Sequence, residues 1–261
     1  MKRHHHNDIR KVFDSHFHII DKRFPLVAND GYLPDDFSCD AYLERTQAYE
    51  LVGGAVISAS FQAFDQTFLL AALEKLGLNF VGVTQLPSSI SDEDVLALDA
   101  CGVRAVRFNL ERGGSESIEN LESLANRIHE LAGWHVELYV DSTCLSEIFY
   151  ILRRLPMVSI DHLGLSKSGF NMLLKLVERG VHIKATGFGR VDLDVRQAIK
   201  EICLANPDAL MFGTDLPGTR TKRPFSDADL ALIDESIDEG LMEKIFFENA
   251  VSLYRPRTIS L

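Results

Sequence analysis

Three short segments of the sequence place histidine and aspartate side chains at spacings that suit hydrolytic chemistry. Residues 14–18 read Asp-Ser-His-Phe-His, residues 160–164 read Ile-Asp-His-Leu-Gly, and residues 213–217 read Gly-Thr-Asp-Leu-Pro. A carboxylate can take a proton from water, and an imidazole can polarise a carbonyl group or bind an oxyanion. The candidate catalytic residues are therefore Asp215, His16, His18 and His162.

Arginines near these segments indicate an anionic substrate. A guanidinium group matches a carboxylate in bidentate geometry. Arg107, Arg112 and Arg190 each lie at the end of an expected strand or in the loop that follows it. Tyr139 and Ser60 add neutral hydrogen-bonding groups. These five residues are the candidate substrate-binding residues.

Eight β-branched runs alternate with amphipathic helical segments along the chain. The runs cover residues 11–19, 54–58, 80–85, 103–109, 134–140, 157–162, 181–186 and 209–215. The helical segments, with apolar residues three and four positions apart, include 40–51, 65–76, 118–131, 145–155, 169–179 and 191–205. Eight such units in about 250 residues match a (β/α)8 TIM barrel, and no glycine-rich nucleotide-binding motif occurs. We expect an α/β fold, one barrel domain at 11–261 after a disordered N-terminal tail at 1–10.

The alternation of side chains along each strand predicts which residues share the barrel mouth, where the active sites of such barrels lie. In the first strand this rule puts Asp14 on the same inner face as His16 and His18. In the sixth strand it groups His162 with Ile160. Inner residues of the other strands include Arg107, Tyr139, Lys184 and Asp215. Charged groups near a barrel core are costly unless they are paired or used, so this set indicates a functional site.

Composition excludes several other classes of protein. The 261 residues are 46% hydrophobic and 25% charged, as in globular proteins. With 27 basic and 38 acidic residues the net charge is −11, and without a basic block neither nucleic acid nor an anionic membrane is an expected partner. The N-terminus lacks the apolar run of a secretory signal, so the expected location is cytoplasmic. The four cysteines form no CxxC pair, so neither a disulfide framework nor a thiolate zinc site is indicated.

The motifs together resemble a known superfamily. The His16-Phe17-His18 segment, the segments at 160–164 and 213–217, and the closing Glu248-Asn249-Ala250 are similar to the amidohydrolase superfamily, specifically its amidohydrolase-2 branch. Within that branch, residues 103–109 and 60–65 resemble the lactonase group that contains 2-pyrone-4,6-dicarboxylate lactonase and sugar-lactone hydrolases. The resemblance runs over most of the chain and implies a hydrolase acting on cyclic carboxylic esters.

The resemblance also bears on metal binding. In metal-dependent members the first-strand histidines and the last-strand aspartate hold a divalent ion, a role that would fall on His16, His18 and Asp215 and would suit zinc or manganese. Two-metal members have further ligands where this chain has Arg107 and Tyr139, and a guanidinium group cannot ligate a cation. The dicarboxylate lactonases are understood to work without metal. The sequence therefore favours no required cofactor, with one divalent ion as the alternative.

The expected function is hydrolysis of a lactone that carries one or more carboxylates. Asp215 would activate water, the three histidines would polarise the carbonyl group, and the arginines would bind carboxylate. Two alternatives stay open: a metal-dependent decarboxylase or other amidohydrolase of small unsaturated acids, and a non-catalytic binding protein for small acids. The expected partner is a small anionic lactone, and a homo-oligomer is compatible with the sequence.

Overall fold

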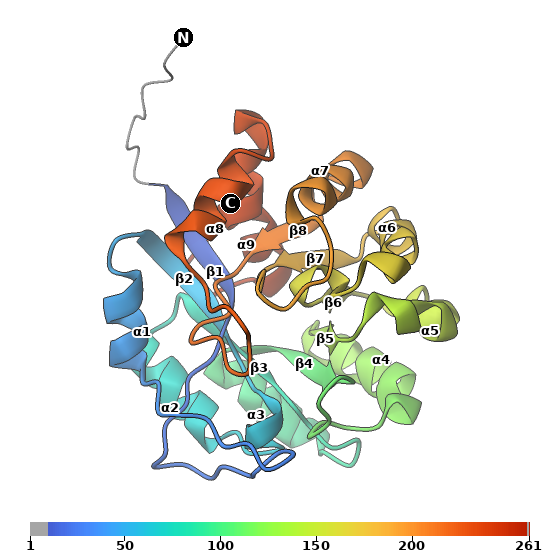
Figure 1. The fold of residues 1–261 in the computed structure, drawn as a ribbon. Coiled ribbons are helices and arrows are strands. Elements are labelled where there is room, and N and C mark those ends of the chain that lie inside the picture. Colours follow the sequence, from blue (N-terminus) through green and yellow to red (C-terminus); the bar gives the residue numbers. More distant parts are fainter. Residues whose placement is uncertain (1–9, 260) are drawn as a thin grey trace.

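Eight parallel strands form the centre of the molecule and follow one another in chain order. The computed structural model describes residues 10–259 and residue 261. The strands are β1 (Lys11–Phe17), β2 (Glu50–Ile57), β3 (Phe80–Thr84), β4 (Val103–Asn109), β5 (His135–Tyr139), β6 (Val158–Ile160), β7 (His182–Ala185) and β8 (Leu210–Phe212). Helices surround them (Figure 1). The predicted (β/α)8 barrel is confirmed, with each expected run supplying one strand.

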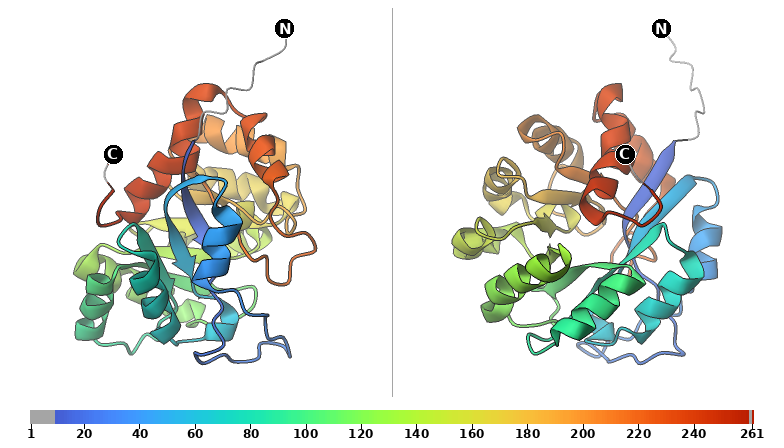
Figure 2. Two further views of the ribbon diagram at one scale, coloured as in Figure 1. Left: turned by 90° about the vertical axis from the view of Figure 1, so that its left-hand side faces the viewer. Right: turned by 180° about the vertical axis from the view of Figure 1, so that it is seen from behind.

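Nine α-helices lie among and after the strands in the sequence. The side and rear views show helices packed around the strands (Figure 2). They are α1 (Cys39–Thr46), α2 (Thr67–Leu76), α3 (Asp92–Cys101), α4 (Leu121–Ala132), α5 (Leu145–Leu152), α6 (Phe170–Val177), α7 (Val195–Ala205), α8 (Asp227–Asp234) and α9 (Asn249–Tyr254); the count applies to the described residues. The six helical segments named from the sequence each overlap one α-helix, and residues 50–51 of the first belong to β2 instead. The pattern did not single out α3, α8 or α9, and α3 buries only Val95 and Leu98, too thin a stripe to give a periodic signal.

Apolar side chains fill one part of the barrel interior. Phe13, Ala55, Val83 and Met211 belong to one buried cluster, and Tyr254 of α9 packs against it. A second, larger cluster joins the outward faces of the strands to the surrounding helices. The polar residues of the barrel interior are thus confined to the part that the apolar cluster leaves open.

The barrel closes where the first and last strands meet. The backbone N–H of Asp215 donates to the carbonyl oxygen of His16 at 2.7 Å, and that of His18 donates to Leu216 at 2.8 Å. Gly213 allows this approach, because a Cβ atom there would lie 2.8 Å from the backbone nitrogen of His16. The closing bonds therefore join the backbone of the candidate catalytic residues directly.

The inner-face prediction for Asp14 is wrong. Its carboxylate accepts hydrogen bonds from the Tyr42 hydroxyl of α1 at 3.1 Å and from the Thr214 backbone and hydroxyl at 2.9 and 2.7 Å. Phe13 instead faces the barrel interior, and an irregularity in the pairing of β1 with β2 between Asp14 and Phe17 returns His16 to the inner face. A bulge of this kind shifts side-chain alternation by one residue.

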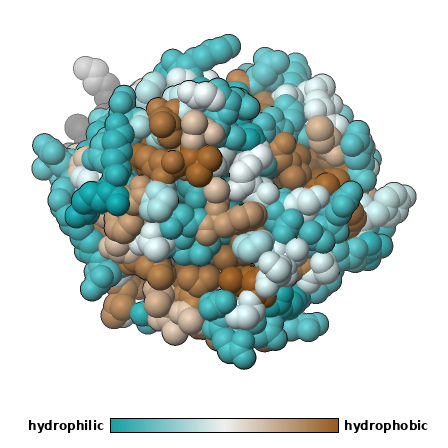
Figure 3. Space-filling model, turned by 90° about the horizontal axis from the view of Figure 1, so that it is seen from below, coloured by the Kyte–Doolittle hydropathy of each residue, from teal (hydrophilic) through white to brown (hydrophobic). Residues whose placement is uncertain are grey.

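The surface and the chain ends bear on the remaining expectations. Figure 3 shows apolar side chains in separate patches among hydrophilic ones on one face of the molecule. A homo-oligomer stays a prediction. Among residues 10–259 and 261, every helix is too short or too polar to cross a bilayer. The tail expected at 1–10 lies outside the described residues except for Arg10, whose guanidinium group pairs with Asp234.

Replacing Asp14 tests the bonds that join β1, α1 and the segment after β8. Asp14→Asn exchanges a carboxylate, which only accepts hydrogen bonds, for an amide. The N–H groups of this amide would face the groups of Tyr42 and Thr214 that donate to Asp14 in the wild type. We expect the free energy of unfolding, measured by urea denaturation, to fall by about 1–3 kcal/mol. Asp35→Asn is the control, because Asp35 is fully exposed and should change it by less than about 0.5 kcal/mol. Equal effects would contradict this assignment.

Candidate active site

A pocket open to solvent lies at the carboxyl ends of the strands. Its lining combines apolar and neutral polar groups with four arginines. The lining residues are His18, Ala59, Ser60, Phe61, Arg107, Asn109, Arg112, Tyr139, His162, Arg190, Thr219 and Arg220. The structure thus brings together seven of the nine candidate residues from the sequence, and the other two, His16 and Asp215, are buried and contact His162, His18 and Arg190 of this lining.

His16, His18 and Asp215 converge at the barrel seam. Oδ1 of Asp215 lies 3.8 Å from Nε2 of His16 and 3.6 Å from Nε2 of His18, and neither this oxygen nor Nε2 of His16 has a hydrogen-bond partner within the described part of the chain. Nδ1 of His18 is 2.8 Å from the carbonyl oxygen of Ile57. Because a carbonyl oxygen only accepts, Nδ1 of His18 carries a proton, and in the neutral ring Nε2 then has the lone pair.

This cluster fits a single divalent ion. The three ligand atoms lie within 4.8 Å of one another, and two imidazoles with a carboxylate suit zinc or manganese. The bond from His18 to a backbone carbonyl is the outer contact usual for a metal-binding histidine. The expectation that no cofactor is required stays a prediction beside this fit.

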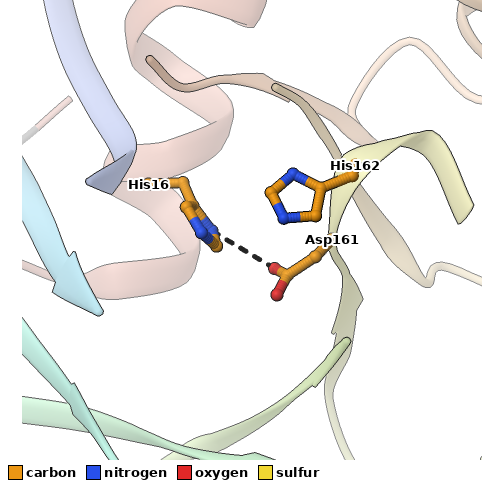
Figure 4. A group of neighbouring side chains, drawn as sticks. All are labelled: His16, Asp161 and His162. Atoms are coloured by element: carbon orange, nitrogen blue, oxygen red, sulfur yellow. Dashed lines mark ion pairs between the residues drawn. The ribbon is translucent and has the colours of Figure 1, made fainter. Parts of the chain in front are cut away.

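The sixth strand departs from the predicted alternation. Val158 and Ile160 both pack in the outer cluster, so the inner residue is Asp161, which sequence reasoning did not assign to the site. His162 reaches the mouth because its backbone has φ of 51°, in the left-handed region, and its ring stands edge-on to the ring of His16. Figure 4 shows His16, Asp161 and His162 facing one another, with the ion pair of His16 and Asp161 marked. Gly187 leaves room for the His162 ring, since a Cβ atom there would lie 2.5 Å from its Nδ1.

Asp161 holds a buried network of charges below the pocket. Its Oδ2 accepts from Nη2 of Arg107 at 2.7 Å, and Arg107 also donates to the Ser58 carbonyl oxygen at 2.9 Å. Its Oδ1 lies 3.5 Å from Nζ of Lys184, which donates to Glu137 at 2.5 Å. Burial raises the pKa of Asp161, but His16, Lys184 and Arg107 outweigh burial and bring it well below its usual value. Arg107 is therefore already paired with a carboxylate, which sets it apart from Arg112 and Arg220 of the pocket lining.

Asp215 is held as an anion by a different arginine. Nε of Arg190 donates to Oδ2 of Asp215 at 2.6 Å, and Nη2 donates to the Thr219 carbonyl oxygen at 2.7 Å. Burial opposes ionisation of Asp215, yet the charge of Arg190 and the neighbouring histidines lower its pKa below the ordinary value. Its φ of 58° is a second left-handed conformation in the site. Such strain in non-glycine residues concentrates at functional sites.

Burial favours the neutral form of His16 and His162, two of the buried histidines. Burial lowers the pKa of His16 to about 4, against the attraction of Asp161. Burial also brings the pKa of His162 well below its usual value, although Asp215 opposes this shift. Each neutral ring therefore offers one donor and one acceptor.

Arg112 and Arg220 face the pocket from loops. Arg112 is exposed, and Arg220, which sequence reasoning missed, donates to Oδ1 of Asn29 at 2.9 Å and lies over the Tyr32 ring. Asn29 also donates to the Arg112 carbonyl oxygen and accepts from the Ser60 hydroxyl. The loop at residues 20–40 is thereby fastened to three other loops at the mouth. Only the basic character of Arg220 and its place five residues after Asp215 gave a signal in the sequence.

Comparisons with known proteins place the chain among hydrolases. A family model described as amidohydrolase matches residues 13–255. A 2-pyrone-4,6-dicarboxylate hydrolase of Comamonas testosteroni is 26% identical over 284 residues, covering 94% of this chain and 90% of the relative. Among solved structures, a protein described as a probable 2-pyrone-4,6-dicarboxylic acid hydrolase from Acinetobacter baumannii, with citric acid bound, matches with a TM-score of 0.83, 19% identity and coverage of 94% and 99%. A similarly described protein from Pseudomonas putida gives a TM-score of 0.78, 24% identity and coverage of 95% and 98%.

The pairing of Arg107 predicts a structural cost that another pocket arginine does not share. Arg107→Met leaves the buried carboxylate of Asp161 without its guanidinium partner, so the free energy of unfolding should fall by about 3–5 kcal/mol. Arg112→Met removes an exposed side chain and should change it by less than about 0.5 kcal/mol. Chemical denaturation of both variants measures the difference. A loss from Arg107→Met as small as that from Arg112→Met would show that the ion pair does not hold the network.

Proposed function

The chain belongs to the amidohydrolase family, and from that membership we propose that it hydrolyses a lactone bearing carboxylate groups. The observation that carries the proposal is the free Oδ1 of Asp215 beneath a pocket lined by four arginines. A carboxylate beside neutral imidazoles supplies proton transfer, and arginines supply recognition of an anion. The name of the Comamonas testosteroni relative supports a cyclic ester with two carboxylates.

The reaction begins with activation of water. Asp215 takes a proton from a water molecule that also donates to the free Nε2 of His18, and the resulting hydroxide attacks the lactone carbonyl carbon. An N–H group of His16 or His162 stabilises the oxyanion that forms. The ring carbon–oxygen bond then breaks, and the protonated Asp215 returns the proton to the departing oxygen. The product is an open-chain acid in which the former ring oxygen is a hydroxyl group, alcoholic or enolic according to the lactone.

The low pKa of Asp215 makes it a weak base until the substrate arrives. Arg190 is the charged partner that lowers that pKa, and it also lines the pocket. A substrate carboxylate that draws the guanidinium group away weakens the pair with Asp215 and raises the basicity of this carboxylate. Binding of the anion thus prepares the base.

His16, His18 and Asp215 are also the residues that would hold a divalent ion. When bound, such an ion would polarise the carbonyl group and lower the pKa of water. The proton transfer and anion recognition assigned above belong to side chains of this chain in either case.

Two arginines remain for substrate carboxylates besides Arg190. Arg107 is engaged by Asp161, whereas Arg112 is exposed and Arg220 donates to neutral oxygen atoms of Asn29. We assign Arg112 and Arg220 to the carboxylates of the substrate. Tyr139, whose ring stands edge-on to His162, and Ser60 supply neutral contacts beside them. A protein that only bound small acids would leave the free Asp215 oxygen without a role.

Loss of the proton-transferring carboxylate tests the proposed base. Asp215→Asn keeps the shape of the side chain, so we expect a normal circular dichroism spectrum and retained binding of a carboxylated lactone. The kcat should fall by a factor on the order of 10² or more, as for loss of general-base catalysis. Turnover close to that of the wild type would remove Asp215 from the mechanism.

Substrate charge tests the role of Arg112. A charge-assisted hydrogen bond contributes roughly 1.5–3 kcal/mol, so Arg112→Met should lower kcat/KM for a carboxylated lactone by about 10- to 150-fold. An uncharged lactone of the same ring size should lose much less. Arg153→Met, exposed and outside this pocket, is the control for a general effect of lost charge. Equal losses on both lactones would mean that Arg112 does not bind the carboxylate.

A further inference from the structure

Lys184 is a fully buried cation that the reaction above does not use. Its ammonium group lies 2.5 Å from Oε2 of Glu137, 3.5 Å from Oδ1 of Asp161 and 3.2 Å from Nδ1 of His16. An ammonium group has three N–H donors and no acceptor. Two of these donors are used in hydrogen bonds to Glu137 and to His16, a candidate catalytic residue, while Oδ1 of Asp161 is an ion-pair neighbour without a hydrogen-bond partner among the described residues.

The contact with Lys184 decides which nitrogen of His16 carries the proton. Nδ1 of His16 also lies 3.3 Å from Oδ1 of Asp161, so a proton on Nδ1 could be donated there. That arrangement would set this N–H against an N–H of Lys184 at 3.2 Å, whereas an unprotonated Nδ1 accepts from Lys184. The ammonium group then lies beside both Nδ1 of His16 and Oδ1 of Asp161, whose electron pairs would otherwise repel each other. The single proton of the neutral ring is left on Nε2.

We propose that Lys184 is a positioning residue that keeps the His16 proton on Nε2, aimed into the site as a donor to the substrate carbonyl oxygen. The chemical role given to His16 rests on the proposed function, but the position of the proton does not. His18 has the opposite arrangement, because the Ile57 carbonyl oxygen holds its proton on Nδ1. The two histidines thus present unlike groups to the same point, a donor from His16 and a lone pair from His18.

The same contact weakens the site for metal ions. A metal-binding Nε2 must be unprotonated, which requires His16 to move its proton to Nδ1 against Lys184. Without Lys184, Nδ1–H can be donated to Asp161, the carboxylate contact usual behind a metal-binding histidine. Removal of Lys184 should therefore both move the proton and strengthen zinc binding.

A double variant and its matched control separate the effect of Lys184 on His16 from the effect of its ion pair with Glu137. Lys184→Met alone leaves the buried carboxylate of Glu137 uncompensated and can fail to fold. Lys184→Met combined with Glu137→Gln removes both partners of the pair, and Glu137→Gln alone is the matched control that keeps the contact of Lys184 with His16. Tyr254→Phe is a second control, since its hydroxyl group bonds to Glu137 and to the Ser15 carbonyl oxygen.

Nitrogen-15 NMR of histidine-labelled full-length protein reports the proton directly. The His16 signals are assigned by their loss in His16→Gln. In the wild type, Glu137→Gln and Tyr254→Phe we expect Nε2 protonated and Nδ1 unprotonated. In the double variant we expect the reverse. A wild type protonated on Nδ1, or a double variant that matches Glu137→Gln, would overturn the proposal.

Zinc titration by calorimetry gives a second readout that needs no substrate. We expect the double variant to bind zinc roughly 10- to 100-fold more tightly than Glu137→Gln, the range seen when outer contacts of metal ligands change. His16→Gln gives the background from other sites. Equal zinc affinity in the two variants would contradict the proposal. If the wild type hydrolyses no lactone, the proposed function is contradicted. The NMR spectra and the zinc affinities still decide the role of Lys184, because neither depends on activity.

Discussion

The seam between β1 and the segment after β8 is the constraint on which the site depends. Closing a barrel requires its first and last strands to meet, and here the closing hydrogen bonds join the backbone of Asp215 to His16 and of His18 to Leu216. The side chains of the same residues then converge without any further folding requirement. Asp14 fixes the other side of this seam through Thr214. The contacts that close the barrel therefore also bring the candidate catalytic residues together.

Charge compensation beneath the pocket sets what each group can do. Burying an ion without its partner costs several kcal/mol, so Asp161 needs Arg107 and Lys184, and Glu137 needs Lys184. Lys184 lowers the pKa of Glu137 to about 2 against the effect of burial. Arg107 and Lys184 are thereby engaged by carboxylates of the chain itself. The interior carboxylates of Asp161 and Glu137 are thus compensated within the protein. In the proposed function, the substrate carboxylates are bound by other arginines of the pocket lining.

The sequence predicted the barrel, its eight strands and most residues at its mouth, because alternating periodicity and motif order are local signals. Two errors have a common cause. The pairing irregularity in β1 turned Asp14 outward, and the left-handed backbone of His162 brought it to the mouth from a strand whose inner residue is Asp161. Alternation assumes a regular strand and cannot register either event. The partner of Arg107 was equally hidden, since Asp161 lies 54 residues away in sequence.

The balance of charge at the mouth favours an anion over a cation as the bound species. Below the pocket the carboxylates of Asp161, Glu137 and Asp215 each have a cationic partner, and burial favours the neutral form of His16 and His162. Arg112 and Arg220 then face the opening without a carboxylate partner among the described residues. A dianionic substrate neutralises this excess, whereas a divalent ion adds to it. The whole chain carries −11 and repels anions at long range, so the positive rim acts only at short distance, where it selects by the placement of charge.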